Sequence, residues 1–265
     1  MDASTTNLQD LGLPASTGAA SKAIAKSRGK LGGILKYGGF GLVGLLALAL
    51  LSNWLWTMSG SNQWELKIDK EGTQIYTLKS PGAALLKTKG VWHSKEFTLN
   101  HHLAPFFDES IQEDCGKWLP ECLNYRILES WDPKTERNIT MWTLKLPGMF
   151  APREILLEGR LYQDPVTKVV TIENIAVPNS LPRNDCCVRI EHFHNIWHFT
   201  PLADGNIRVE FLSDWEMGGA FPTLLLNLAG PGEVFKALTK TNPEFLRQEK
   251  FRNARFDFID STPAQ

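Results

Sequence analysis

The chain has 265 residues, 43% of them hydrophobic and 22% charged, and its formal net charge is −1. This near-neutral balance, without a long basic patch carrying interleaved aromatic residues, argues against nucleic acid as a partner. Nine Trp and fourteen Phe are many for this length, and they predict either a core of large side chains or a lined cavity.

An apolar run from Tyr37 to Met58 is the most informative feature of the chain. Ser52 and Asn53 are its only strongly polar residues. About 20 apolar residues, rising 1.5 Å each, cross a hydrocarbon core of roughly 30 Å. We therefore predict a transmembrane anchor at 37–58, preceded by a disordered basic arm at 1–36.

The flanking charges predict how this anchor is oriented. Five basic residues precede the run, namely Lys22, Lys26, Arg28, Lys30 and Lys36, whereas the lysines after it are balanced by acidic residues. The positive-inside rule therefore places the arm in the cytoplasm and the C-terminal domain on the non-cytoplasmic side of the membrane, periplasmic in a bacterium. A cleaved signal peptide is the alternative, because it also combines a basic region with an apolar core.

After a short link at 59–63, segments that alternate with period two predict strands. The expected strands are Gln74–Leu78, Thr88–His93, Asn138–Leu144, Ile155–Tyr162, Val169–Asn174, Cys187–Phe193, Ile196–Thr200 and Ile207–Trp215. Cys187–Phe193 and Ile196–Thr200 are expected to pair across a short turn. A helix is expected at Leu99–Cys115, with Phe106, Phe107 and Ile111 toward the core. Apolar faces opposite polar faces predict an antiparallel sheet that is solvated on one side.

The period then changes from two to about 3.6. Phe221–Leu228 and Glu233–Thr239 are expected to be helical and to be interrupted at Gly230-Pro231-Gly232, because proline removes a backbone donor. Pro243–Arg252 predicts a further helix. Strands followed by terminal helices indicate an α+β domain at 64–250, with a C-terminal tail at 251–265. A long curved sheet closed by an apolar helix would enclose a pocket.

The four cysteines leave the redox state open. They are Cys115, Cys122, Cys186 and Cys187, and the paired Cys-x₂-Cys spacing of a structural zinc site is absent from them. Across a membrane, Cys115 and Cys122 could form a disulfide; buried free thiols are the alternative. Asn138-Ile139-Thr140 spells a glycosylation sequon, which has meaning only in a eukaryotic secretory route.

Motifs spread over the body resemble those of the START domain, a lipid-binding family. Trp64–Leu78 is similar to the opening of that domain, and Pro152-Arg153-Glu154 to the start of one of its strands. Val188-Arg189 with the segment 197–205 resembles the hairpin before the last strand. Gly218–Pro222 followed by Asn227 resembles the entry to the closing helix. The resemblance covers about residues 64 to 245.

This resemblance implies a helix-grip fold, in which a curved, nine-stranded antiparallel sheet surrounds the C-terminal helix. It also implies that a tunnel between them holds one lipid and opens at its mouth. Sterol-binding members resemble one another in a buried arginine–acid pair. Here the nearest arginine, Arg160, points outward by alternation, and the preceding strand offers Thr140, Trp142 and Thr143 instead of an acid. Sterol specificity is therefore not implied.

We expect the ligand site to consist mostly of apolar and aromatic side chains with few polar groups. His192 follows the inward Val188 and Ile190 and is a candidate contact for a head group, although a buried histidine without a ligand is the alternative. The candidate ligand-binding residues are Trp142, Arg160, His192, Trp197, Phe211, Trp215, Leu224, Leu225, Leu228, Phe235 and Leu238. Each apolar member could equally be ordinary core.

We find no catalytic constellation or convincing metal triad in the sequence and expect no cofactor, since Gly-x-Ser-x-Gly is absent and no carboxylate completes a convincing triad with the histidines 192, 194 and 198. The sequence therefore predicts a membrane-anchored lipid-binding or lipid-transfer protein that is not an enzyme and that holds one hydrophobic ligand in an internal cavity. The alternatives are an enzyme on the same scaffold, such as a cyclase or hydrolase acting on an apolar substrate, and an interaction module with a filled core.

Overall fold

The computed structural model describes residues 43–219, 221 and 223–262, and the chain divides into two units, Met1–Leu55 and Trp56–Gln265. Residues 43–58 are helical. Among the described residues, no helix is long and apolar enough to cross a membrane. The predicted arm at 1–36 and the first part of the predicted anchor, 37–42, lie outside the described residues.

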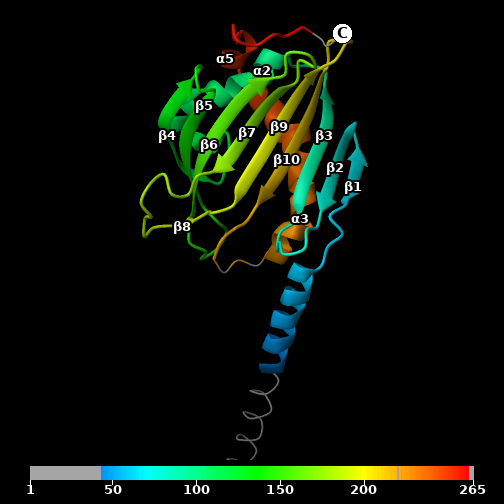
Figure 1. The fold of residues 1–265 in the computed structure, drawn as a ribbon, viewed down its shortest axis with the longest axis vertical. Helices are drawn as coiled ribbons and strands as arrows, with labels where there is room; N and C mark the ends of the chain where they lie inside the picture. Colours follow the sequence, from blue (N-terminus) through cyan, green and yellow to red (C-terminus); the bar gives the residue numbers. More distant parts are fainter. Residues whose placement is uncertain (1–42, 220, 222, 263–265) are drawn as a thin grey trace, which may run out of the picture. The chain divides into compact units, whose positions relative to one another are not determined.

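The second unit is built on one curved sheet (Figure 1). Nine strands follow one another in the order β1-β2-β3-β10-β9-β7-β6-β5-β4, all antiparallel, and β8 joins β6 as a short parallel strand. The strands are β1 Trp64–Lys70, β2 Thr73–Leu78, β3 Lys87–Ser94, β4 Cys122–Asp132, β5 Arg137–Leu144, β6 Arg153–Gln163, β7 Val170–Ala176, β8 Val188–Arg189, β9 Phe193–Pro201 and β10 Ile207–Trp215.

The helices lie along one face and at one end of this sheet. Figure 1 shows the longest of them, α3, running along the face of β3 and β10, and α2 and α5 together at one end. α3 contacts β1, β2 and β3. The helices are α2 Leu99–Leu103, the 3₁₀ turns η1 Ala104–Phe107, η2 Glu109–Gln112 and η3 Cys115–Lys117, then α3 Thr223–Lys236, the π-helical turn η4 Ala237–Thr241, α4 Asn242–Leu246 and α5 Glu249–Arg252.

Alternation along the strands gives the sheet one face toward α3, which we call the inner face. On β10, Ile207, Val209 and Phe211 lie on this face and pack in the largest core cluster, together with Leu238 of η4. The opposite face carries the charged residues of the same strand, Arg208 and Glu210. Because the side-chain period of a strand is two, one face is apolar while the other is solvated, as predicted from the sequence.

The predicted helix at Leu99–Cys115 is shorter than expected. Thr98 caps α2, its hydroxyl accepting from the His101 amide at 3.3 Å, and the α-helix ends at Leu103. Pro105 follows and has no amide hydrogen to continue the ladder, so the chain proceeds through three 3₁₀ turns. The core positions were nevertheless correct, since Ile111 is buried and Phe106 and Phe107 pack against the main core.

The predicted hairpin of Cys187–Phe193 with Ile196–Thr200 is wrong. Only Val188–Arg189 is extended, and it pairs in parallel with Arg153–Glu154 at the start of β6. β9 begins at Phe193 and pairs with β7 and β10. Two strands, β1 and β4, were not predicted. β1 alternates poorly because it carries charges along an exposed edge, and register shifts in β4 break the period-two pattern.

The C-terminal helices also differ from the prediction. α3 runs through Pro231 without the expected break at 230–232. Contacts hold the helix on both sides of the proline. Before it, the side chain of Asn227 accepts a hydrogen bond from Leu86 N at 2.9 Å and donates one to Ala84 O at 3.0 Å. After it, Phe235 packs against the core. The predicted tail at 251–265 contributes to the domain, since Phe251 and Ile259 are buried in core clusters.

Candidate functional site

The two ends of the inner face differ in burial. At the end covered by α2 and α4, which we call the closed end, Phe199, Val209 and Val170 are at most 2% exposed. At the other end, which we call the open end, several inner-face side chains are only partly buried although they face the same way, and they pack beside the buried Ile155 and Leu157. These open-end residues are Trp142, Leu144, Phe193 and Trp215. The inner face is therefore sealed at one end and reached by solvent at the other.

The cavities that the structure describes are small. One of about 60 Å³ lies at the closed end and is lined by aromatic side chains, among them Trp92, His102, Phe106, Trp197 and Phe199. Another of about 50 Å³ lies between β6 and the segment at Phe258 and Ile259. Drug-sized ligands usually occupy about 300–1,000 Å³. Neither cavity could hold a lipid without movement of the elements around it.

Aromatic rings line the inner face from one end to the other. Trp197 and Phe211 lie 4.4 Å apart between ring centroids, and Phe193 and Trp215 lie 6.2 Å apart at the open end. Trp142 of β5 contacts Tyr125 of β4, with centroids 4.4 Å apart. Flat apolar rings of this kind offer large contact area to an apolar chain at low conformational cost.

Arg153 connects two loops at the rim of the open end. It is the first residue of β6 and is 3% exposed. Its guanidinium donates to Met217 O at 2.6 Å, to Gly218 O at 3.1 Å and to Ala151 O. These carbonyls belong to the loop before β6 and to the segment that leads into α3, so one buried side chain fixes both.

The segment leading into α3 is built for a sharp change of direction. Gly218 and Gly219 have φ angles of +61° and +60°, which residues with a Cβ adopt only at a cost. Phe221 follows, and its ring lies 4.8 Å from that of Phe150 in the other loop that Arg153 holds. At this point of the rim, the contact between the rings of Phe150 and Phe221 joins the two loops.

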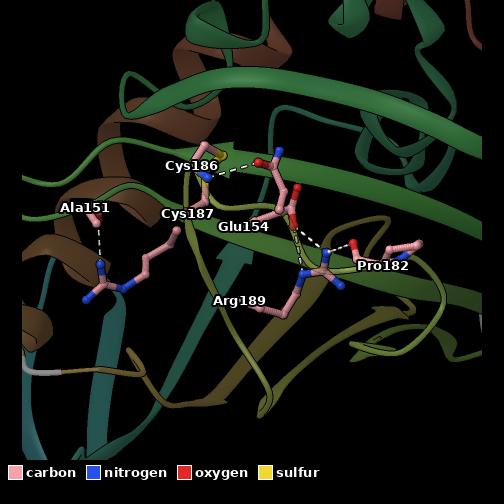
Figure 2. Close-up of a disulfide and its surroundings, with 8 residues drawn as sticks. Ala151, Glu154, Pro182, Cys186, Cys187 and Arg189 are labelled. Carbon is pink, nitrogen blue, oxygen red and sulfur yellow. Dashed lines mark hydrogen bonds and ion pairs between the residues drawn. A yellow bond between two sulfur atoms is a disulfide. The ribbon is translucent and has the colours of Figure 1, made fainter.

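A second buried arginine holds another part of the rim. Arg189 of β8 donates to the Glu154 carboxylate at 2.8 Å through Nε and also bonds the carbonyls of Pro178, Leu181 and Pro182. The side chains of the ion pair are 2% and 5% exposed. Figure 2 shows Arg189 directed at Glu154, with Pro182 beside it. The pair therefore fixes the loop at 177–182 against β6.

Two disulfides also belong to this region. Cys115 is joined to Cys122, and Cys186 is joined to its neighbour Cys187 just before β8 (Figure 2). The disulfide that the sequence left open at Cys115 and Cys122 is thus present. Disulfides are typical of proteins in oxidising compartments, whereas cysteines stay as free thiols mainly in reducing ones.

Six of the predicted ligand-binding residues lie on or against the inner face. Trp142, Trp197, Phe211 and Trp215 come from β5, β9 and β10, and each is partly buried. Phe235 of α3 and Leu238 of η4 pack against the core, with Leu238 only 2% exposed. Leu238 approaches the sheet at Gly90, where an added Cβ would lie 2.3 Å from its methyl group.

Arg160 and His192 do not face the site. Arg160 lies on the outer face, where its Nε donates to Glu158 at 2.6 Å, as alternation along β6 requires. His192 lies outside the strand, and its Nε2 is 3.1 Å from the outer-face carboxylate of Asp214. The inward position predicted for His192 assumed that a strand runs from 187 to 193. The observed strand, β8, ends at Arg189, so the alternation does not reach His192.

The three leucines of α3 are exposed instead of lining an enclosed pocket. Leu224, Leu225 and Leu228 are 63%, 62% and 73% exposed. Their spacing places them on one side of the first two turns of α3, near the rim segment that contains Phe221. Met149 of the neighbouring rim loop is 97% exposed as well. The rim of the domain is therefore unusually apolar for a solvated surface.

Two titratable groups near the inner face, His102 and Tyr125, are uncharged at neutral pH. Burial lowers the pKa of His102 to about 3, and its Nε2 has no hydrogen-bond partner among the described residues. Burial also raises the pKa of Tyr125 to about 12. Neither group is paired with a second catalytic-type residue among the contacts described, and within those residues no cluster of potential metal ligands occurs.

Sequence reasoning missed Arg153 and Arg189 as rim residues. Both were noticed only as parts of family-like motifs, and their burial could not be read from composition. For Arg153, the signal available was an arginine at an inner position of a strand start, where an unpaired charge would be costly. Such a residue needs acceptors, and the loop carbonyls supply them.

Comparisons with known proteins agree with this architecture. No family model matches the chain. Over 199 residues it is 21% identical to an uncharacterized protein of Pseudomonas aeruginosa, which covers 69% of this chain and 89% of that protein.

Solved structures with a similar fold include STAR-related lipid transfer proteins. The fragment 25–204 of one from Xanthomonas axonopodis has a TM-score of 0.58 at 21% identity, covering 70% of this chain and 99% of that chain. Human STARD10 has a TM-score of 0.61 at 13% identity, covering 73% and 77%. Human StAR-related lipid transfer protein 5 has a TM-score of 0.54 at 14% identity, covering 77% and 98%. The predicted helix-grip fold, a curved antiparallel sheet with a C-terminal helix, is thereby confirmed.

Proposed function

We propose that this chain binds one lipid between the inner face of the sheet and α3 and transfers it to or from a membrane. The observation that carries this proposal is the partly exposed aromatic wall at the open end, formed by Trp142, Phe193 and Trp215. Two of the neighbours of the same fold, from Xanthomonas axonopodis and human, are named as lipid transfer proteins, which supports the same class of ligand here.

Lipid entry requires the rim to open, because the cavities of about 60 and 50 Å³ are too small. The segment that joins β10 to α3 supports such a movement, since its two glycines, Gly218 and Gly219, have φ angles of +61° and +60°. The ring contact of Phe150 with Phe221 would then separate. Burial of the lipid tail, at roughly 25 cal/mol per Å² of apolar surface, would drive entry.

We further propose that residues 37–58 anchor the chain in a membrane, with the arm cytoplasmic and the domain on the non-cytoplasmic side. The apolar run and its preceding lysines support this topology. The two disulfides also support it, because disulfides persist in oxidising compartments. An anchored domain would meet membrane lipid without a diffusional search.

One observation favours a different function. The small cavities are what an interaction module with a filled core would show, and in that case the exposed apolar rim would serve a partner instead of a lipid. An enzyme on this scaffold would need convergent polar groups with shifted pKa values. His102 is a lone group of that kind at the closed end.

A transfer assay distinguishes these functions. The full chain is reconstituted in donor vesicles that contain pyrene-labelled phosphatidylcholine and pyrene-labelled ceramide, and movement to acceptor vesicles is followed. Ala176→Trp fills the inner face at the open end, and Ile175→Trp places the same ring on the outer face one residue away. We expect transfer by the natural chain and by Ile175→Trp, and loss of transfer with Ala176→Trp. Equal rates for both variants, or no transfer by the natural chain, would contradict the proposal.

A further inference from the structure

One transverse row of the inner face crosses six adjacent strands and is polar on five of them, with a glycine on the sixth. The strand register pairs its members directly, from β3 through β10, β9, β7 and β6 to β5. The members of this polar row are Thr88, Ser213, Asn195, Asn174, Gly159 and Asn138. Each has the same parity along its strand as residues that pack in the apolar core, so the row lies on the inner face.

The rows on both sides of it are mainly apolar, with Thr140 of β5 as a polar member of the row toward the open end. Toward the closed end, the next row contains Phe211, Trp197 and Ile172, which pair with one another in the same order. Toward the open end, Trp215 pairs with Phe193, and Ala176 pairs with Leu157. The polar row is therefore a narrow band across a mainly apolar wall, placed between the closed and open ends.

The carboxamides of the row converge where the backbone leaves room. A Cβ built on Gly159 would lie 2.3 Å from Asn138 Oδ1 and 3.3 Å from Asn174 Oδ1. Any other residue at 159 would displace these side chains. Asn138, the first residue of the sequon, therefore has its side chain on the inner face of the sheet.

Asn195 of β9, the next residue of the row, has a side-chain oxygen without a hydrogen-bond donor. Its Oδ1 is buried and has no partner among the described residues. Leaving a buried acceptor unsatisfied costs about 1–3 kcal/mol, and most buried polar groups in proteins are paired. The unpaired Asn195 Oδ1 is therefore unfavourable for folding alone and suits a ligand that supplies the missing donor.

The wall around the row carries no compensating charge for an ionised ligand. Among the described strand residues, Glu158, Glu173 and Glu210 have the parity of the outer face. Arg153 has inner parity, but it lies at the rim and is occupied by backbone carbonyls. Burying an ionised group without a partner costs several kcal/mol, whereas carboxamides and hydroxyls both donate and accept.

We infer that the polar row binds an uncharged polar linkage of the lipid, an amide, ester or hydroxyl, with apolar segments of the ligand extending toward both ends of the inner face. This inference rests on the proposed function and names the class of ligand for the same site. A lipid whose only polar group is ionised fits the row poorly, because its charge would be buried against three neutral carboxamides.

The test uses three probes that share a pyrene-dodecyl tail. One carries a neutral hydroxyethyl amide, one carries no polar group, and one carries a carboxylate, which is ionised at about pH 8. Binding to the full chain in non-ionic detergent micelles is measured by energy transfer from tryptophan to pyrene. We expect the amide probe to bind about tenfold more tightly than the other two, as one or two added hydrogen bonds would give.

Variants assign this preference to the row. Asn195→Leu removes the polar group at nearly constant volume, and Gly159→Ala keeps every polar group but displaces two carboxamides. Each is expected to weaken binding of the amide probe about tenfold while leaving the apolar probe within about twofold. Asn179→Leu, the same exchange in an exposed loop, is the control and is expected to change neither. If Asn195→Leu does not fold, Asn174→Leu replaces it.

The outcomes separate the two claims. If the natural chain binds all three probes alike, or if the row variants leave the amide preference intact, the inference about the row is overturned and the lipid-binding function stands. If the natural chain binds none of the probes, the proposed function fails and the inference fails with it. A preference for the carboxylate probe would overturn the assignment of an uncharged linkage.

Discussion

The closed and open ends of one inner face are held together by different interactions. At the closed end, side chains such as Phe199, Val209 and Leu103 are buried in a continuous apolar cluster. At the open end, the aromatic side chains are partly exposed, and the backbone is fixed by Arg153, the Arg189–Glu154 pair and two disulfides. Directional and covalent links thus supplement a smaller packed cluster, which contains Ile155 and Leu157, where the wall is accessible.

This difference has a physical reason. Apolar packing stabilises a region only while water is excluded from it. A region that must admit a ligand cannot depend on a sealed core, because opening would remove its stability. Buried ion pairs and disulfides fix individual loops and leave the space between them free. The comparison therefore predicts that the closed end carries most of the stability and the open end carries most of the binding.

The largest expected effect contrasts two aromatic residues. Phe199→Ala at the closed end should lower the free energy of unfolding by about 4 kcal/mol, because it leaves a cavity in a packed cluster. Trp215→Ala at the open end should cost about 1–2 kcal/mol, since its ring is only partly buried, but should weaken lipid binding. Urea unfolding of the full chain in micelles measures the first, and tryptophan–pyrene energy transfer the second. Equal losses of stability would remove the distinction between the ends.

Next in size is the ion pair at the rim. Arg189→Met leaves the buried Glu154 carboxylate without its partner and should cost about 3 kcal/mol. Arg160→Met breaks a pair with Glu158 on the exposed outer face and should cost less than about 1 kcal/mol. Hydrogen exchange should also become faster at 177–182 in Arg189→Met alone. Unchanged protection there would show that the arginine does not fix the loop.

The two disulfides should differ from each other. Replacing Cys115 and Cys122 by alanine opens a loop that spans a separation of seven residues, and chain entropy then predicts a loss of about 2.5 kcal/mol. Replacing Cys186 and Cys187 opens almost no loop, because they are neighbours, so a loss below about 1 kcal/mol is expected. Thermal unfolding of the two double variants compares them. The opposite ranking would show that the vicinal pair acts by more than chain entropy.

The smallest effect within a single pH unit concerns His102 at the closed end. The pKa of His102 is about 3 in the folded chain and near 6.5 when unfolded, so the unfolded chain binds more protons between these values. Stability should therefore fall by about 1.4 kcal/mol for each pH unit below 6.5 because of this residue. His102→Phe keeps a ring among Trp92, Phe97 and Phe199 and should remove that slope. A slope that survives the exchange would assign it to other groups.

The sequence predicted the closed end better than the open end. Period-two patterns identified β10 and β3, and the core positions of Phe106 and Ile111 followed from the residue types. The rim could not be predicted in the same way, because Arg153 and Arg189 act through carbonyls of distant loops. Local patterns contain no record of such contacts, and the assumed strand at 187–193 therefore placed His192 on the wrong face.

The polar row illustrates the same limit for the binding site. Its residues are an unremarkable Asn, Ser, Thr or Gly in their own strands, and only the register between strands brings Asn138, Asn174 and Asn195 into one row. The sequence predicted a set of apolar lining residues, of which Trp142, Trp197 and Phe211 lie on the inner face. Register depends on long-range pairing, and a single sequence does not specify it.

Native mass spectrometry of the full chain, released from non-ionic micelles, tests the central claim most directly. The natural chain and Ile175→Trp should each retain one lipid per chain, and Ala176→Trp, with its ring on the inner face at the open end, should appear without lipid. A bare natural chain, or one lipid retained equally by Ala176→Trp, would contradict the claim that the inner face holds the ligand.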